Sequence, residues 1–186
     1  MEILAYRSNL MIVLFYREVE LLPQLREILL RRWGLPHFES ETQIVQTPSA
    51  FQQEMGSPLS KNVFSFPKLI EPSEFVLIKN ACITLEEKFC ERGLRKINLD
   101  VWSLDDSKWV YYARKSLPHR LYHSNGIHQD LQLLFLKEKL QVLPWSFTEV
   151  KNHSYEEDLL QIRNLYLEKL KELKQILVPP SISSFK

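Results

Sequence analysis

The stretch Leu10-Met-Ile-Val-Leu-Phe-Tyr16 gives the first indication of the fold. It is a short, continuous apolar run with β-branched and aromatic members, which is typical of a strand buried on both faces. Downstream, apolar residues recur every three or four positions from Val19 to Trp33, and Gly34 follows. That spacing predicts an amphipathic helix that ends at Gly34. A central strand and a helix that covers it therefore begin the domain.

The length and composition fit one domain. The chain has 186 residues, of which 45% are hydrophobic, and this is enough to bury a substantial core. No repeat or low-complexity linker divides it. We expect a single domain over residues 1–186, with a core over about 10–177 and a short disordered tail at 179–186.

The charges nearly cancel. Lys and Arg number 24 against 23 Asp and Glu, a formal net charge of +1. Such a chain has no overall field to gather nucleic acid or an acidic membrane, so any anion site must be local. Aromatic and basic residues do interleave between Trp109 and Tyr122, which leaves nucleic-acid binding as the third of three hypotheses.

Both cysteines, Cys82 and Cys90, fall in one predicted helix. Eight positions are about 12 Å along a helix axis, too far for a disulfide. We interpret them as buried thiols of a reducing cytoplasm. The run Leu10 to Tyr16 is too short to span a bilayer and no charged leader precedes it, so we expect a cytoplasmic protein without a membrane partner.

The later elements are indicated by periodicity and turn residues. A three-four apolar stripe predicts a second helix, and Asn125-Gly126 is a strong hairpin signal because both residues accept positive φ angles. The expected further strands cover residues 43–46, 51–55, 63–66, 97–102, 109–113, 120–123, 127–136 and 140–143. The expected further helices are one over about 73–91 and a final one that begins with a capping box at Ser154–Glu157 and runs to Pro179-Pro180.

This order predicts the α+β class. We expect a mainly antiparallel sheet with a ferredoxin-like βαββαβ core, a C-terminal β-meander and a terminal helix. The alternative is a larger antiparallel sheet with helices on one face.

Common catalytic and cofactor motifs are missing from the sequence. With glycines only at 34, 56, 93 and 126, it contains no phosphate-binding loop and no dinucleotide fingerprint. It also lacks Cys-x-x-Cys, His-Glu-x-x-His and Gly-x-Ser-x-Gly, the usual zinc, redox and hydrolase signatures. The cofactor is therefore unknown from the sequence.

Three histidines, His119, His123 and His128, lie close to the predicted hairpin turn. Two on one extended strand, His119 and His123, are about 13 Å apart, too far to share a metal ion unless the strand bends. The turn could bring His123 opposite His128, but no third ligand is obvious. We predict no metal site.

A basic string at residues 114–120, Arg-Lys-Ser-Leu-Pro-His-Arg, is a candidate anion site. Lys115 and Arg120 could hold a phosphate or carboxylate, while His119 could act as acid, base or hydrogen-bond donor. The alternative is a solvent-exposed loop with scattered charges.

Carboxylates form a second candidate. Asp100, with Asn98 beside it, together with Glu54 and Glu86, could converge on a metal ion or share a proton. Spacing alone cannot show convergence, and each carboxylate taken singly is more often a surface residue or a helix partner.

Several fragments together resemble a known family. They are Glu54-Met-Gly56, Phe64-Ser-Phe66-Pro-Lys-Leu-Ile70-Glu-Pro72, Ile78-Lys79 with Glu86, Arg95-Lys-Ile-Asn-Leu-Asp100, His119-Arg-Leu-Tyr122, Gly126-Ile127 and Pro144-Trp145. Their order and spacing are similar to the bacterial uncharacterised proteins grouped as domain of unknown function 4416. The resemblance runs from about residue 10 to 166 and implies a cytoplasmic single-domain protein, without an established activity.

The chain departs from the family pattern at several polar positions. Ala50-Phe51 stands where the pattern has Tyr-Tyr, and Asp100-Val-Trp-Ser103 where it has Asp-Pro-Gly-Tyr. A family site that used those positions would be altered or inactive here. The polar residues that still match are Glu54, Lys79, Glu86, Arg95, Asn98, Asp100, Lys115, His119 and Arg120.

Two leading hypotheses follow. In the first, the domain binds an anionic small molecule or phosphate ester, with or without catalysis. Its candidate catalytic residues are His119, Asp100 and Glu54, and its candidate ligand-binding residues are Lys115, Arg120, Arg95, Asn98, Lys79 and Glu86. In the second, it is a non-catalytic interaction module that offers a protein partner an exposed aromatic sheet face, formed by Trp102, Trp109, Tyr111 and Tyr112, and the charged C-terminal helix.

Overall fold

The computed structural model describes residues 7–45, 54–136 and 139–177, with side chains described up to residue 173. The predicted tail at 179–186 lies outside these ranges.

The elements in chain order are β1 (Ser8–Tyr16), a 3-10 turn (Val19–Leu21), α1 (Leu22–Trp33), β2 (Phe38–Glu39), β3 (Gln43–Val45), β4 (Leu59–Ile70), α3 (Glu74–Lys88), β5 (Cys90–Glu91), β6 (Leu94–Arg95), β7 (Ile97–Leu104), β8 (Lys108–Ala113), β9 (Leu121–Ser124), β10 (Ile127–Leu136), β11 (Lys139–Val142), α4 (Thr148–Lys151) and α5 (Glu156–Leu177).

One large sheet organises the molecule. Its strands follow the order β11-β10-β8-β7-β1-β4-β2, with β3 also beside β4 and β9 beside β10. The pairings recorded for this sheet are all antiparallel. Strand β1 lies at the centre, and its apolar residues alternate between two cores. The prediction of a central strand buried on both faces is confirmed.

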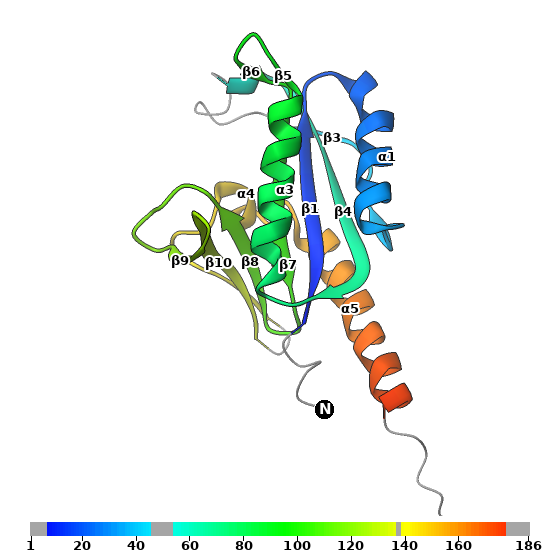
Figure 1. The fold of residues 1–186 in the computed structure, drawn as a ribbon. Coiled ribbons are helices and arrows are strands. Elements are labelled where there is room, and N and C mark those ends of the chain that lie inside the picture. Colours follow the sequence, from blue (N-terminus) through cyan, green and yellow to red (C-terminus); the bar gives the residue numbers. More distant parts are fainter. Residues whose placement is uncertain (1–6, 46–53, 137–138, 178–186) are drawn as a thin grey trace, which may run out of the picture.

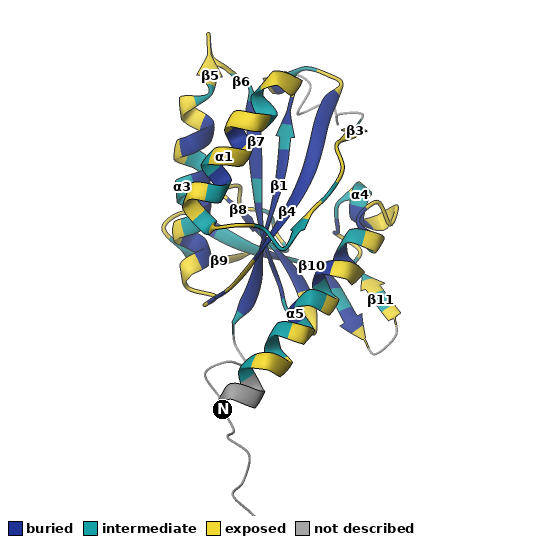
Figure 2. Ribbon diagram, turned by 90° about the vertical axis from the view of Figure 1, so that its right-hand side faces the viewer, coloured by how far each residue is buried: buried dark blue, intermediate teal, exposed yellow. Residues whose placement is uncertain are grey.

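Helices cover both faces of this sheet (Figure 2). On one face α1 and α3 pack over Ile12, Leu14 and Leu99, and α3 runs beside β1 and β7 (Figure 1). On the other face α4 and α5 pack with Met11 and Trp102. The alternative of helices on one face is therefore wrong, because apolar residues on both faces of β1 need cover.

The α+β class and the mainly antiparallel sheet are confirmed, whereas the ferredoxin-like detail is not. The central strand pairs with β4 on one side and β7 on the other, both antiparallel. The short strands β2 and β3 come between α1 and β4 and extend the sheet at its edge. The chain therefore builds a wider antiparallel sheet than the predicted βαββαβ core.

Local differences from the predicted elements have simple causes. Strand β4 continues through Pro67 because the register with β1 shifts between Asn9 and Leu10, and such irregularities tolerate proline. Residues 54 and 55, expected in a strand, are helical, and residues 51–53 lie outside the described ranges. Cys82 is buried as expected, but Cys90 is exposed because α3 ends before it, at Lys88.

The hairpin at Asn125-Gly126 is confirmed. Both residues have positive φ angles, 50° and 74°, and β9 pairs with β10 across the turn. A register shift next to the turn places Tyr122, and not His123, opposite His128. The two histidines therefore do not form the cross-strand pair that the sequence suggested.

Candidate functional site

The site begins where β8 leaves β7. The two strands pair from Val101 to Leu104, so Leu99 lies beyond the last paired position. Helix α3 takes the place of the missing strand: Lys79 Nζ donates to the Leu99 carbonyl at 2.8 Å, and a Glu86 oxygen accepts from the Leu99 N–H at 2.7 Å. These side chains satisfy main-chain groups that would otherwise be buried without partners.

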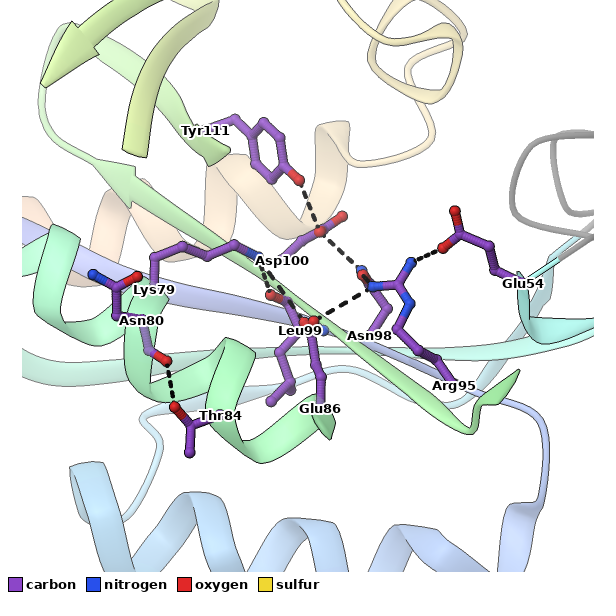
Figure 3. Close-up of polar contacts among 10 residues, drawn as sticks. All are labelled: Glu54, Lys79, Asn80, Thr84, Glu86, Arg95, Asn98, Leu99, Asp100 and Tyr111. Atoms are coloured by element: carbon purple, nitrogen blue, oxygen red, sulfur yellow. Dashed lines mark hydrogen bonds and ion pairs between the residues drawn. The ribbon is translucent and has the colours of Figure 1, made fainter. Parts of the chain in front are cut away.

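Arg95 connects this strand edge to neighbouring polar residues. It contacts Glu86 at 3.4 Å and Asn98 at 3.2 Å, and it also pairs with Glu54 (Figure 3). Burial raises the pKa of Glu86, while Lys79, the Leu99 N–H and Arg95 oppose the rise. Glu86 is thus held by several donors that favour its charged form.

Asp100 presents an acceptor on the opposite face of β7 from Leu99. One of its oxygens accepts from Asn98 at 2.9 Å and from the Tyr111 hydroxyl at 3.0 Å (Figure 3). Burial first, and then the charge of Asp100, raise the pKa of Tyr111 well above its usual value, so the hydroxyl stays protonated. The second Asp100 oxygen receives no hydrogen bond from the described residues and can accept one from a ligand.

A cavity of about 490 Å³ opens at this edge of β7, where its lining includes residues of both α3 and α4. Aromatic side chains form much of its apolar wall, among them Phe15, Tyr111 and Phe147. The described lining includes six cationic side chains and three carboxylates. The cations are Lys61, Lys79, Arg95, Arg114, Lys115 and Arg120, and the carboxylates are Glu86, Asp100 and Glu149.

The basic string contributes three of these cations. A buried carboxylate holds the Arg120 side chain in place. Its Nε donates to Asp130, which is fully buried, at 2.7 Å, and its guanidinium lies 5.5 Å from the centre of the Tyr111 ring. Arg114 and Lys115 are exposed. Their side chains form no ion pair or hydrogen bond with the rest of the described chain, so their charges remain available to an anion.

His119 and Glu54 stand apart from the lining. The Nε2 atom of His119 lies 3.3 Å from the Asp130 oxygen that Arg120 also contacts, and its ring stacks on Trp145. Glu54 reaches the site through Arg95. The structure thus brings Asp100 and the predicted ligand-binding residues to one cavity, whereas these two candidate catalytic residues are not part of its described lining.

Lys61 is the feature that sequence reasoning missed. Its side chain lines the cavity although the residue is only 2% exposed, and its Nζ lies 4.1 Å from the centre of the Tyr155 ring. Burial lowers the pKa of Lys61, against the opposing charges of Asp158 and Glu149. The sequence did contain a signal, because Lys61 is two positions before Val63 and hence on the same face of a strand that begins earlier.

Within the ranges that the structure describes, no three His, Cys, Asp or Glu side chains gather as a metal ion would require. No described helix combines the length and apolar character needed to cross a membrane.

Fold and site together define an α+β domain in which an antiparallel sheet, covered by helices on both faces, carries a charged cavity at the divergence of β7 and β8. The chain belongs to the family described as Domain of unknown function (DUF4416), whose model matches residues 6–166. That range includes every residue in the described lining of the cavity. No curated protein and no solved structure matches the chain.

Proposed function

We propose that the cavity binds an anionic small molecule, with a phosphate ester as the best-fitting class. The observation that carries the proposal is a group of cations that line the cavity without an ion pair among the described residues, Lys61, Arg114 and Lys115, in a chain whose formal net charge is only +1. The other three cations of the lining are paired with carboxylates. A local excess of positive charge beside aromatic walls suits a ligand with an anionic group and an apolar or ring-shaped body.

The cavity offers the ligand two kinds of contact, positive charges and a hydrogen-bond acceptor. Arg114 and Lys115 supply charges that are not used elsewhere in the described chain, and Arg120 supplies a guanidinium whose direction is fixed by Asp130. Such fixed donors bind an anion with little loss of side-chain freedom. Asp100 accepts a hydrogen bond from a hydroxyl or amino group of the same ligand. The acid–base roles of His119 and Glu54 stay predictions.

The interaction-module hypothesis has less support. It placed Trp102, Trp109 and Tyr112 on an exposed sheet face, but each of these residues is at most 2% exposed. The same burial removes most of the stacking surface that the nucleic-acid hypothesis needed. We therefore develop the small-molecule proposal alone.

The test compares phosphorylated and unphosphorylated partners of the same compound, glucose 6-phosphate with glucose and adenosine monophosphate with adenosine. We expect thermal stabilisation by a phosphorylated member only, and binding at least about tenfold weaker in calorimetry for the double variant Arg114→Ala, Lys115→Ala. The matched control is Lys88→Ala, Lys171→Ala, which removes two exposed lysines outside the cavity. Equal weakening in the control, or no response to any phosphorylated member, contradicts the proposal.

A further inference from the structure

Lys61 occupies an unusual position for a lysine. It lies near the start of β4, on the face that also carries Leu59 and Val63, and only 2% of the residue is exposed. Lysine is almost never buried to this extent unless its charge is paired. Lys61 nevertheless belongs to the lining of the cavity, so this enclosed side chain lies at a cavity wall.

The contacts of the Lys61 amino group do not account for its burial as a charge that stabilises the fold. Its recorded contact is the face of the Tyr155 ring, at 4.1 Å from the ring centre. Glu149 and Asp158 act on it through space, but neither lies within ion-pair distance, and Nζ makes no hydrogen bond to the part of the chain that the structure describes. A lysine kept for stability would be expected to hold a carboxylate or carbonyl, as Lys79 does.

Burial has a chemical consequence. A desolvated amine is easier to deprotonate, and burial lowers the pKa of Lys61 accordingly, although the nearby charges of Asp158 and Glu149 oppose the shift. A neutral amine has a free lone pair and is a nucleophile toward carbonyl carbon, whereas an ammonium ion is not.

We propose that Lys61 is a nucleophilic amine that forms a Schiff base with an anionic carbonyl compound held in the cavity. This inference rests on the proposed function, because the cations of the lining are what would hold the anionic part. The lone pair of Nζ forms the new C–N bond, the carbonyl C–O bond breaks, and the oxygen leaves as water with the two amine protons. No oxidant or reductant takes part in the step.

The experiment uses pyridoxal 5′-phosphate, which carries an aldehyde and a phosphate, at low excess over the full chain, followed by reduction with borohydride. Peptide mapping by mass spectrometry then locates the secondary amine. We expect most of the adduct on Lys61 in the wild-type protein and at least a tenfold loss of that adduct in Lys61→Arg, which keeps the charge but cannot form the imine. Lys88→Arg, at an exposed lysine, is expected to leave the labelling unchanged.

Modification spread evenly over surface lysines overturns the inference, and this result needs only the wild-type protein. Two further probes separate it from the proposed function. If pyridoxine phosphate, which lacks the aldehyde, protects the protein thermally but no adduct forms on Lys61, anion binding stands and the nucleophile fails. If pyridoxal without phosphate labels Lys61 as fast as pyridoxal 5′-phosphate does, the nucleophile stands and the anion site fails.

Discussion

The two faces of the central sheet use buried charge in opposite ways. On the face covered by α3, Lys79 and Glu86 are buried and bonded to both main-chain groups of Leu99. On the face covered by α4 and α5, Lys61 is equally buried, yet the one contact recorded for its amino group among the described residues is the Tyr155 ring, with Asp158 and Glu149 acting on it from beyond ion-pair distance. Burial of a charge costs free energy at both positions. Within the described residues, hydrogen bonds to the main chain offset this cost for Lys79 and Glu86 but not for Lys61.

This difference distinguishes structural charges from candidate functional charges within one cavity. Glu86 and Lys79 line the cavity, but their polar atoms are largely occupied by a strand edge. Lys61, Arg114 and Lys115 line the same cavity with charges that no ion pair among the described residues occupies. We expect changes of the first kind to alter folding stability and changes of the second kind to alter ligand chemistry.

Replacement of Glu86 should have the largest effect on stability. In Glu86→Ala the Leu99 N–H loses its acceptor and Lys79 loses its nearest carboxylate, and breaking a buried pair of this kind costs about 3 kcal/mol. Urea unfolding, monitored by tryptophan fluorescence, measures the loss. The isosteric Glu86→Gln keeps an acceptor for Leu99 and should lose about 1 kcal/mol.

The neighbouring exposed carboxylate provides the control. Glu87→Ala lies one position further along α3 on its solvent side and should change the free energy of unfolding by at most about 0.5 kcal/mol. Equal losses at positions 86 and 87 would show that the helix, and not the contact with Leu99, determines the result. The conclusion that Glu86 stabilises the fold through its contact with Leu99 would then be wrong.

Much of this architecture was predictable because local rules governed it. The apolar run of β1 and the Asn125-Gly126 hairpin have strong signals that the structure confirms. The order of the strands was not predictable, because it depends on long-range pairing that periodicity does not encode. Cys90 was placed in the wrong element for a related reason: the apolar stripe of α3 gives no clear end before Gly93.

The site was only partly predictable. The basic string and the Asn98–Asp100 pair do reach one cavity, although they come from different strands and loops. His119 and Lys61 show what the sequence could not decide. The ring of His119 lies against Asp130, eleven residues later, and Lys61 is directed inward because its strand starts earlier than its apolar pattern. Both outcomes depend on tertiary neighbours.

Replacement of Lys61 should change stability in the opposite direction from that of Glu86. Lys61→Met keeps the volume of the aliphatic stem and removes a buried amine that forms no ion pair within the described part of the chain, so we expect a gain of about 1 kcal/mol in the free energy of unfolding. Urea unfolding at pH 7 measures it. Lys88→Met, at an exposed lysine, should stay within about 0.5 kcal/mol of wild type. A clear loss of stability in Lys61→Met would place this lysine with the structural charges.

The smallest expected effect is the pH dependence of that gain. Since burial lowers the pKa of Lys61, the folded protein holds fewer protons on this amine than the unfolded chain does, between the lowered pKa and the ordinary lysine value. Stability of the wild type therefore rises with pH across that window, and Lys61→Met lacks this contribution. Asp158 loses the charge of Lys61 in the variant, so the comparison is made above the range in which carboxylates titrate.

The advantage of Lys61→Met over wild type should thus shrink as the pH is raised from about 7 to about 9.5, below the range in which tyrosines ionise. Unfolding curves of both proteins at four or five pH values give the difference directly. An advantage that stays constant or widens would mean that the buried amine is not deprotonated more easily than an exposed one. In that case the two faces of the sheet would differ in hydrogen bonding alone, and the nucleophilic character of Lys61 would lose its electrostatic basis.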